Sequence, residues 1–480
     1  MNKYNLWAII FCCWGATTYG FDSGLTTSII GYPEFIEYFK FDSVTLGALG
    51  STYYAGNFFG SLCNIWLPDK FGRLRTIQFA CILSFLGAGL QTGAPNLGVL
   101  LAGRAIGGIA CGIIVAVCPL FASELSPPHV RGRVGGLYNV NINVSYMVTE
   151  WMGLGFSYVN GDLKWRLFIG LQIFCAAIML LGSFWMPFSP RWLVSKGRYD
   201  EALRVLERLH RDGGYDRGDG GADEIPFYQR EFNQIKAQIA YEQENPQLGL
   251  IGIIKRPSYR RRLFIILFFF VFQQLTAIIP LQNYQVLLYQ SLGLDGKLPL
   301  VLVGVWGTVG VIFSAVGASY FDRIGRRKSF FISMTLVTIG SILLTAFWAT
   351  YEKTGNTVKT FGSLALWAMF VYLTGYALCL NAFGYAYTPE ILPLPIRATG
   401  VATGFATMNG IIIMLVQVTP LALESITWKY FLIFVFMDVI FILGVFFHFP
   451  ETANKPLEEI AALFGDEVVV TLEEATGKEA

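Results

Sequence analysis

The segment Asp69-Lys-Phe-Gly72-Arg73-Leu-Arg75 has a second version later in the chain, Asp322-Arg-Ile-Gly325-Arg326-Arg327-Lys328. In both copies an acidic residue stands three positions before a glycine, and basic residues follow the glycine at once. Each copy also comes directly after a long apolar run. This recurrence indicates two halves of the chain built on one pattern.

A second motif recurs at matching places. Glu124 precedes Arg131 by seven residues, and Glu390 precedes Arg397 by the same interval. Two independent motifs in equivalent loops favour duplication of a whole domain over chance similarity.

The composition requires an apolar solvent for most of the chain. Of the 480 residues 54% are hydrophobic and 14% are charged, and the mean hydropathy is +0.51, outside the range of soluble domains. We find twelve apolar runs, each about long enough to cross the roughly 30 Å core of a bilayer. The runs are 6–30, 46–67, 77–92, 97–122, 134–158, 167–187, 263–291, 298–321, 330–350, 361–389, 398–423 and 430–449.

Lys and Arg are concentrated in the loops after even-numbered runs, and such loops stay in the cytoplasm. We therefore expect a multi-pass membrane protein with both termini cytoplasmic. The residues concerned are Lys70, Arg73, Arg75, Arg131, Arg133, Arg260, Arg261, Arg262, Arg323, Arg326, Arg327, Lys328 and Arg397.

One long polar stretch divides the chain. We predict an N-terminal six-helix bundle over 1–187, a cytoplasmic linker with short helices over 188–262, a C-terminal six-helix bundle over 263–450, and a cytoplasmic tail over 451–480. Within the linker, residues 199–211 place apolar side chains on one helical face, which suits a helix lying against the bundle.

At these motifs the chain resembles the major facilitator superfamily, and finer marks resemble its sugar porter branch, in the form of the fungal-type sugar transporters. The finer marks are Gly20-Phe-Asp22, Gly103-Arg104, Pro187-Phe-Ser-Pro190-Arg191-Trp192, Gln273-Gln274 and Pro450-Glu451-Thr452. Phe188 departs from the family, which usually has Glu there, and Ala453-Asn454 replaces Lys-Gly. The resemblance implies an all-α membrane protein with twelve transmembrane helices in two pseudo-symmetric six-helix bundles, the major facilitator fold.

The resemblance also implies a cytoplasmic gate made of charged residues at helix ends. Such bonds would favour the outward-open state if they form only when the cytoplasmic side is closed. The alternative is that these charges only fix the topology. The expected gate residues are Asp69, Arg73, Glu124 and Arg131, with Asp322, Arg326, Glu390 and Arg397 as their counterparts.

Charges inside the membrane are costly and usually serve a function. Asp22 and Arg104 match the pair that couples protons to transport in some family members, although facilitators can carry the same Asp. Withdrawal of the Arg would favour proton uptake by the Asp. Glu150 and Asp438 also lie inside predicted membrane runs, and the alternative to a function is a polar contact between helices or a charge facing a water-filled crevice.

The resemblance implies a substrate site at the midplane, with amides for hydroxyl groups and an aromatic face for the ring. Two family amides are missing, since Ile279 and Gly310 stand where Asn is usual. Asn141 and Asn143 have the alternative role of bonding between helices. The expected substrate-binding residues are Gln273, Gln274, Asn139, Tyr385, Asn283 and Tyr284.

Together these features predict a secondary active transporter that moves a sugar across the plasma membrane by alternating access and proton symport. The expected partners are a small solute, protons and the lipid bilayer. We expect a monomer, no nucleic acid, no cofactor and no metal, and the protein is not expected to be an enzyme because no catalytic constellation converges. The alternatives are a transporter of another polyhydroxylated or carboxylated solute (an inositol, a quinate-like acid, a secondary metabolite), a facilitator, or a nutrient sensor.

Overall fold

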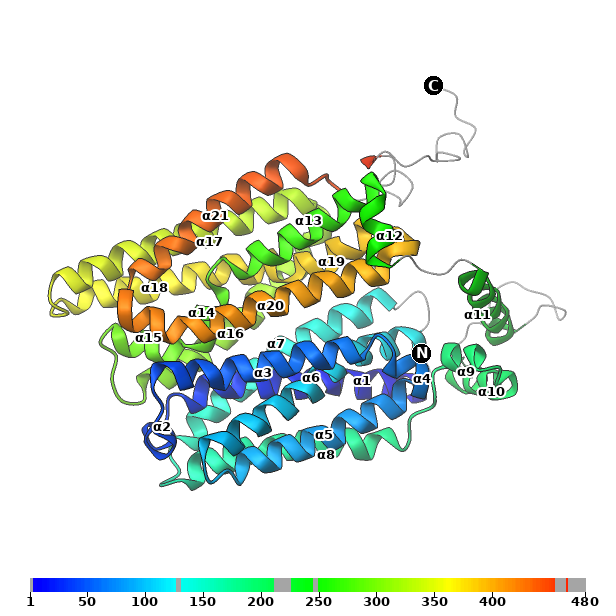
Figure 1. Cartoon of the computed structure of the whole chain (residues 1–480), viewed down its shortest axis with the longest axis horizontal. Coiled ribbons are helices and arrows are strands. Elements are labelled where there is room, and N and C mark those ends of the chain that lie inside the picture. Colours follow the sequence, from blue (N-terminus) through cyan, green and yellow to red (C-terminus); the bar gives the residue numbers. More distant parts are fainter. Residues whose placement is uncertain (1–2, 127–130, 211–225, 245–248, 454–462, 465–480) are drawn as a thin grey trace. The chain divides into compact units, whose positions relative to one another are not determined.

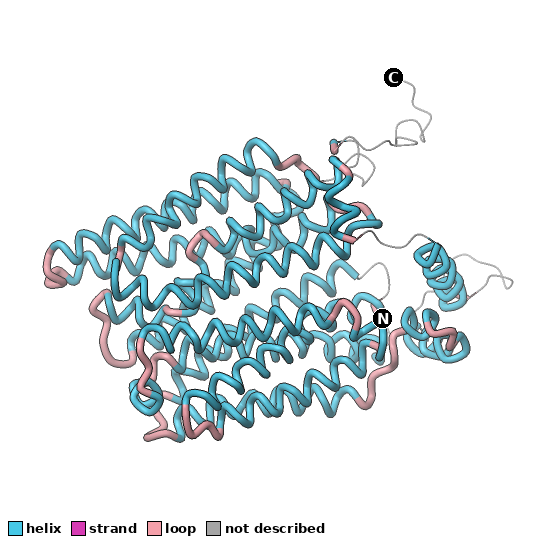
Figure 2. Tube along the Cα trace, in the orientation of Figure 1, coloured by secondary structure: helices cyan, strands magenta, loops and turns pink. Residues whose placement is uncertain are grey.

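The structure is a computed structural model that describes residues 3–126, 131–210, 226–244, 249–453 and 463–464. Within these ranges all regular elements are helices (Figures 1 and 2). The chain forms two compact units, Met1–Pro246 and Gln247–Ala480.

Unit 1 contains six long helices and five short ones or linker helices. They are α1 (Lys3–Ile29), α2 (Pro33–Phe39), α3 (Ser43–Cys63), α4 (Leu67–Phe71), α5 (Arg73–Thr92), α6 (Leu97–Leu125), α7 (Arg131–Phe156), α8 (Leu163–Ser183), α9 (Pro190–Ser195), α10 (Tyr199–His210) and α11 (Phe227–Glu244).

Unit 2 has a similar set with more interruptions. Its elements are α12 (Leu250–Lys255), α13 (Pro257–Gln274), α14 (Ile278–Asn283), α15 (Gln285–Ser291), α16 (Leu298–Ile324), α17 (Arg326–Lys353), α18 (Lys359–Gly375), the π-helix η2 (Tyr376–Leu380), α19 (Asn381–Ile391), α20 (Leu394–Ile426) and α21 (Lys429–His448).

Every predicted apolar run coincides with one of these helices or with a series of them. Among the described residues, eight helices are long and apolar enough to cross a membrane. The other four predicted runs correspond to α1, α3, α7 and the interrupted series α13 to α15. Three of these four less apolar elements carry candidate residues, namely Asp22, Asn139 and Gln273, as expected where polar groups in a membrane serve a function.

Unit 2 departs from regular helix at two places. The chain leaves α13 after Gln274, and Ala277 adopts a φ of 77° before α14 begins. The tenth predicted run is interrupted by η2, a π-helix between α18 and α19. Interrupted membrane helices and π-helical turns often accompany binding sites, because they free backbone groups from the helical ladder.

The predicted linker contains α9 to α12, and the first three of these belong to unit 1. The side chains of Ala202, Leu206 and Leu209 on α10 are buried. The Arg208 guanidinium lies 4.0 Å from the ring centroid of Tyr4 and so joins α10 to α1. The boundaries drawn from the sequence at 187, 262 and 450 stay predictions.

Helices α3 and α6 pack backbone to backbone through glycines. A Cβ on Gly108 would lie 2.1 Å from the Tyr53 carbonyl oxygen, and one on Gly56 would lie 2.2 Å from the Ala105 carbonyl oxygen. Small residues at four-residue spacing allow this approach between membrane helices, where packing replaces the hydrophobic effect as the force that joins them.

The glycine contact predicts a stability effect that a control can isolate. Gly108→Ala should destabilise unit 1 by about 1 to 3 kcal/mol, because the added methyl group cannot fit against backbone. Gly89→Ala on α5 is the matched control, since nothing lies within 4 Å of its Cβ position. Thermal unfolding followed by size-exclusion chromatography should show a lower midpoint for Gly108→Ala only; equal midpoints would contradict the close packing.

Candidate functional site

A buried ion pair joins α1 to α6 inside unit 1. Arg104 Nη1 donates to Asp22 Oδ1 at 3.2 Å, and Arg104 and Asp22 are 0% and 4% exposed. The Cys111 thiol donates to the second carboxylate oxygen at 3.2 Å. Arg104 Nη2 also donates to the Thr26 hydroxyl. The structure thus brings together the two residues predicted for proton coupling.

An aromatic ring also contacts the Arg104 guanidinium, and one of its nitrogen atoms is left without a described hydrogen-bond partner. Its Cζ lies 5.5 Å from the centroid of the Tyr53 ring, a cation–π distance. The Tyr53 hydroxyl is in turn 3.0 Å from that of Ser23 on α1. The remaining donor, Arg104 Nε, has no hydrogen-bond partner among the described residues. Because a buried donor without a partner is costly, the pair is less than fully satisfied in this arrangement.

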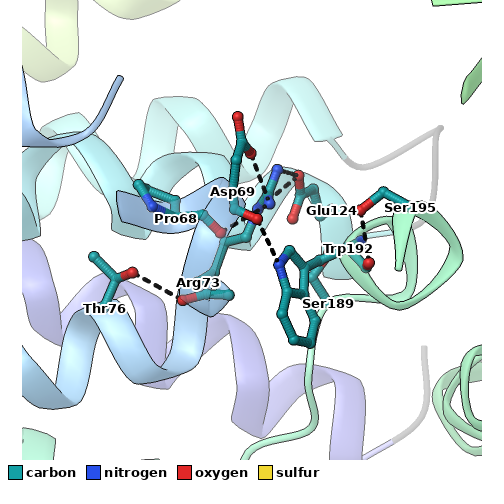
Figure 3. Close-up of polar contacts among 9 residues, drawn as sticks. Pro68, Asp69, Arg73, Thr76, Glu124, Ser189, Trp192 and Ser195 are labelled. Carbon is teal, nitrogen blue, oxygen red and sulfur yellow. Dashed lines mark hydrogen bonds and ion pairs between the residues drawn. The ribbon is translucent and has the colours of Figure 1, made fainter. Parts of the chain in front are cut away.

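The N-terminal charge cluster, defined as Asp69, Arg73 and Glu124, lies at the start of α5 (Figure 3). Arg73 Nη2 and Nε donate to Glu124 Oε1 at 2.8 and 3.1 Å. Arg73 Nη1 lies 3.0 Å from Asp69 Oδ1 and also donates to the Pro68 carbonyl at 3.2 Å. The cluster ties α4 and α5 to the end of α6, all within unit 1.

Trp192 of α9 completes this cluster, a role that the sequence did not reveal. Its indole N–H donates to the Asp69 carbonyl at 3.1 Å (Figure 3). Its ring packs on Gly72, whose φ of 91° and lack of a side chain make room for it. Phe188 stacks on Trp192 with 5.5 Å between the centroids, and the Arg75 guanidinium lies 5.7 Å from the Phe188 ring. Phe188, which stands where the resembled family usually has Glu, thus makes aromatic contacts here.

The C-terminal charge cluster, defined as Arg326, Glu390, Glu451 and Thr452, has a related arrangement in unit 2. Arg326 Nη2 donates to Glu390 Oε1 at 2.8 Å, as Arg73 does to Glu124. The Thr452 hydroxyl donates to Glu390 Oε2 at 2.6 Å. The duplicated motifs therefore build equivalent Arg–Glu pairs in the two units.

Glu451 caps α17. Its carboxylate accepts the backbone N–H groups of Arg326 and Arg327 at 2.8 and 2.9 Å, and those of Thr452 and Ala453 at 3.1 and 3.0 Å. Burial raises the pKa of Glu451, but the four N–H groups outweigh burial and bring the pKa below its usual range. In the sequence, Glu451 is part of a motif that resembles the sugar porters, but the motif did not predict this contact.

Three of the predicted gate residues do not take part in the described charge clusters. The side chains of Arg131 and Asp322 lie outside the described part of the structure. Arg397 donates through Nε to the Leu392 carbonyl at 3.0 Å, while Glu390 bonds to Arg326 and Thr452. Their role in a gate stays a prediction.

The two candidate amides of α13 are buried beside the irregular backbone of unit 2. Gln273 Nε2 donates at 3.0 Å to the carbonyl of Leu380, the last residue of η2. Gln274 Nε2 donates to Gln273 Oε1 at 3.4 Å. The side chains are 3% and 4% exposed. Gln273 therefore connects the two interrupted helices, in addition to any contact with a solute.

The other predicted substrate residues differ in their contacts: two of them bond to backbone carbonyls of unit 2. Asn283 Nδ2 donates to the Ile279 carbonyl at 3.1 Å, and the Tyr284 hydroxyl donates to the Val416 carbonyl at 2.7 Å. Asn139 is half-buried on α7, and the side chain of Tyr385 lies outside the described part of the structure.

Asn141 bonds between two helices, as the alternative to substrate binding expects, whereas Asn143 bonds within its own helix. Asn141 bonds across to α1 through the Cys13 carbonyl, whereas Asn143 donates to the Asn139 carbonyl within α7.

The family model described as "Sugar (and other) transporter" matches residues 7–464. The chain belongs to this family. It is therefore a multi-pass membrane transporter of a small solute, and not an enzyme.

Relatives in the transporter family differ in what they carry. The chain is 29% identical to the MFS-type transporter criB of Aspergillus cristatus, over 95% of this chain and 93% of that protein. It is 27% identical to the high-affinity glucose transporter of Kluyveromyces lactis, over 97% and 86%. It is 26% identical to the quinate permease of Neurospora africana, over 96% and 89%.

A solved structure matches the fold of this transporter. The xylose transporter XylE from E. coli, in a partially occluded inward-open conformation, matches with a TM-score of 0.76 at 18% identity, over 95% of this chain and 100% of that one. The predicted major facilitator fold is confirmed.

The cap on α17 predicts a pH-dependent contribution to stability. Because the pKa of Glu451 is lowered in the folded protein, its contribution is present above the unfolded-state pKa and is lost as the pH falls through the folded-state pKa. Glu451→Gln should therefore lower the free energy of unfolding at neutral pH by about 0.5 to 1 kcal/mol, measured as a lower thermal midpoint, and have no effect in acid. Glu207→Gln on exposed α10 serves as the control; a deficit that persists in acid would contradict the charged cap.

Proposed function

We propose that the protein is a secondary active transporter that moves a sugar, a hexose, pentose or related compound, across the plasma membrane by alternating access and proton symport. The observation that carries the proposal is the buried Asp22–Arg104 pair. A buried pair of this kind stabilises a fold only weakly, because desolvation offsets its attraction. Its retention inside a membrane unit is better explained by a function.

The pair supplies a proton switch by simple electrostatics. While Arg104 contacts Asp22, its positive charge favours the ionised carboxylate and works against the effect of burial. When the guanidinium withdraws, the carboxylate is left without its counter-charge in an apolar interior and takes up a proton. Thr26 and Tyr53 already contact the guanidinium beside Asp22, and are proposed to hold it when it leaves the carboxylate. Proton binding on Asp22 is thus linked to rearrangement of α1 against α6.

The amides Gln273 and Gln274 are proposed to recognise solute hydroxyl groups. Both carry donors and acceptors, and both stand where α13 ends and the backbone changes direction. Asn139, Asn283, Tyr284 and Tyr385 complete the proposed set.

The charge clusters are proposed to hold the helix ends during transport. The described bonds of each cluster lie inside a single unit. Each cluster therefore makes the end of its own unit rigid, as a unit that moves as a body requires. Asp69 is the most open member, with a side chain that is 73% exposed.

Another polyhydroxylated or carboxylated solute is the second candidate. Ile279 and Gly310 lack the amides usual in sugar porters, and relatives of similar identity include one named as a quinate permease. A competition screen with D-glucose, D-xylose, an inositol and quinate in a transport-deficient host distinguishes the two.

Proton coupling predicts a distinct phenotype for Asp22→Asn. The variant should lose accumulation against a gradient and keep exchange, because the site is fixed in a neutral form. The measurement is uptake of labelled solute with and without an uncoupler, beside surface abundance. If the wild type ignores the uncoupler, the protein is a facilitator and Asp22 has a structural role.

Loss of the proposed hydroxyl ligands should weaken binding. Gln273→Ala and Gln274→Ala should each cost roughly 1 to 3 kcal/mol, or about five-fold to a hundred-fold in affinity, since a solute hydroxyl is left unpaired. Asn409→Ala, which removes a buried amide of α20 bonded to its own helix, should leave affinity unchanged. Unchanged affinity in the double Gln variant would place the solute elsewhere.

A further inference from the structure

Unit 2 buries a carboxylic acid to which the proposed mechanism assigns no role. Asp438 is in the middle of α21 and is 0% exposed. Among the described residues, neither of its side-chain oxygens has a hydrogen-bond partner. Asp22 in unit 1, by contrast, is bonded to Arg104 and Cys111.

The described helices that pack on α21 offer Asp438 no positive charge. The Ser341 hydroxyl of α17 interacts with it without reaching hydrogen-bond geometry, and α13 presents the aromatic rings of Phe268, Phe269 and Phe272 to the Phe441 ring. The charged residues of α13, α17, α18, α20 and α21 stand at the helix ends, at Arg260, Arg261, Arg262, Arg326, Arg327, Lys328, Glu352, Lys353, Lys359, Arg397, Glu424, Lys429 and His448.

A proton is the ligand that suits this position. An ionised carboxylate in an apolar interior without a partner is strongly unfavourable, and such a group neutralises instead. A metal cation would need several oxygen ligands at once, whereas a proton needs only the carboxylate.

Tyr372 and Thr276 form a short hydrogen-bonded series that ends on the backbone of Gln273, the residue that carries one of the candidate amides. The Thr276 hydroxyl lies 2.8 Å from the Gln273 carbonyl, to which it donates, and 3.1 Å from the Tyr372 hydroxyl. Because Thr276 has a single O–H, Tyr372 must donate to Thr276. Tyr372 lies close enough to Asp438 for the charge of an ionised carboxylate to act on it, although no hydrogen bond joins the two described side chains.

The charge of Asp438 acts on this series from a distance, because no hydrogen bond joins Asp438 to Tyr372 among the described contacts. A neutral, protonated Asp438 leaves the Tyr372 O–H directed at Thr276, and so supports the turn of backbone at Gln273 to Ala277. The negative charge of an ionised Asp438 would attract the Tyr372 O–H dipole and weaken that bond. Tyr376, which stacks on Tyr372 with centroids 6.3 Å apart, is the other titratable group beside the series.

We infer that Asp438 is a second proton-binding site of this transporter, and that Tyr372 and Thr276 couple it to the backbone at the end of α13, which carries Gln273 and Gln274. The first half of the inference is independent of the proposed function, and the second half rests on it. By the reciprocity of linked equilibria, solute should then bind more tightly when Asp438 is protonated.

Infrared spectroscopy of the purified full-length protein tests the proton site without any solute. The wild type at neutral pH should show the carbonyl band of a protonated carboxylic acid, which Asp438→Asn should lose and Asp22→Asn should keep. Identical spectra for the wild type and Asp438→Asn would overturn the inference. Loss of the band when NaCl replaces choline chloride would overturn it in favour of a metal cation.

Binding of D-glucose, measured from neutral pH up to about pH 10 in an Asp22→Asn background, tests the coupling. Affinity should fall by up to about tenfold per pH unit as Asp438 ionises. Asp438→Asn and Tyr372→Phe should both abolish this dependence, and Tyr372→Phe should keep the infrared band.

Tyr430→Phe is the matched control, because that hydroxyl bonds to Thr419 and lies outside the series. It should keep both the band and the pH dependence. An unchanged pH dependence in Tyr372→Phe would overturn the coupling. Failure of every solute to bind, with the infrared result intact, would count against the proposed sugar substrate and leave the proton site standing.

Discussion

The cost of placing charge in an apolar interior governs how both units arrange their ionisable groups. In unit 1 the cost is offset by pairing, since Asp22 has both a guanidinium and a thiol within hydrogen-bond distance. In unit 2 no comparable partner reaches Asp438 among the described residues. Binding a proton is then the way in which this carboxylate avoids a buried charge. Two units built on one pattern thus solve the same electrostatic problem in different ways.

The two units resemble each other more closely at their helix ends than in their buried carboxylates. Arg73 and Arg326 each start a helix after a glycine of positive φ, and each bonds to a Glu at the end of another helix of its own unit. The units differ in what completes the cluster. A tryptophan from the segment after α8 donates to a backbone carbonyl in unit 1, whereas a glutamate after α21 accepts backbone N–H groups in unit 2. The segment that follows the sixth helix of each bundle therefore contacts the repeated loop in both cases.

The sequence predicted the helical fold because membrane helices satisfy their own backbone groups and so leave a local signal. It also predicted the contact of Asp22 with Arg104, through the resemblance. It could not predict the cap by Glu451, because that contact joins residues 125 positions apart and depends on the ends of two helices meeting. The π-helix at η2 was equally hidden, since no residue type in Tyr376–Leu380 specifies it.

The irregular backbone of unit 2 already engages the side chain of Gln273, one of the amides proposed to bind solute. A π-helical turn leaves a carbonyl without its usual α-helical donor, and the amide of Gln273 satisfies the Leu380 carbonyl at the end of η2. Gln274 then bonds to the oxygen of Gln273. Under the proposed function, a solute hydroxyl that engages Gln273 must share or displace one of these bonds, which would link solute binding to the geometry of both interrupted helices. A transporter needs such a link, because recognition of a small solute has to change the balance between conformations.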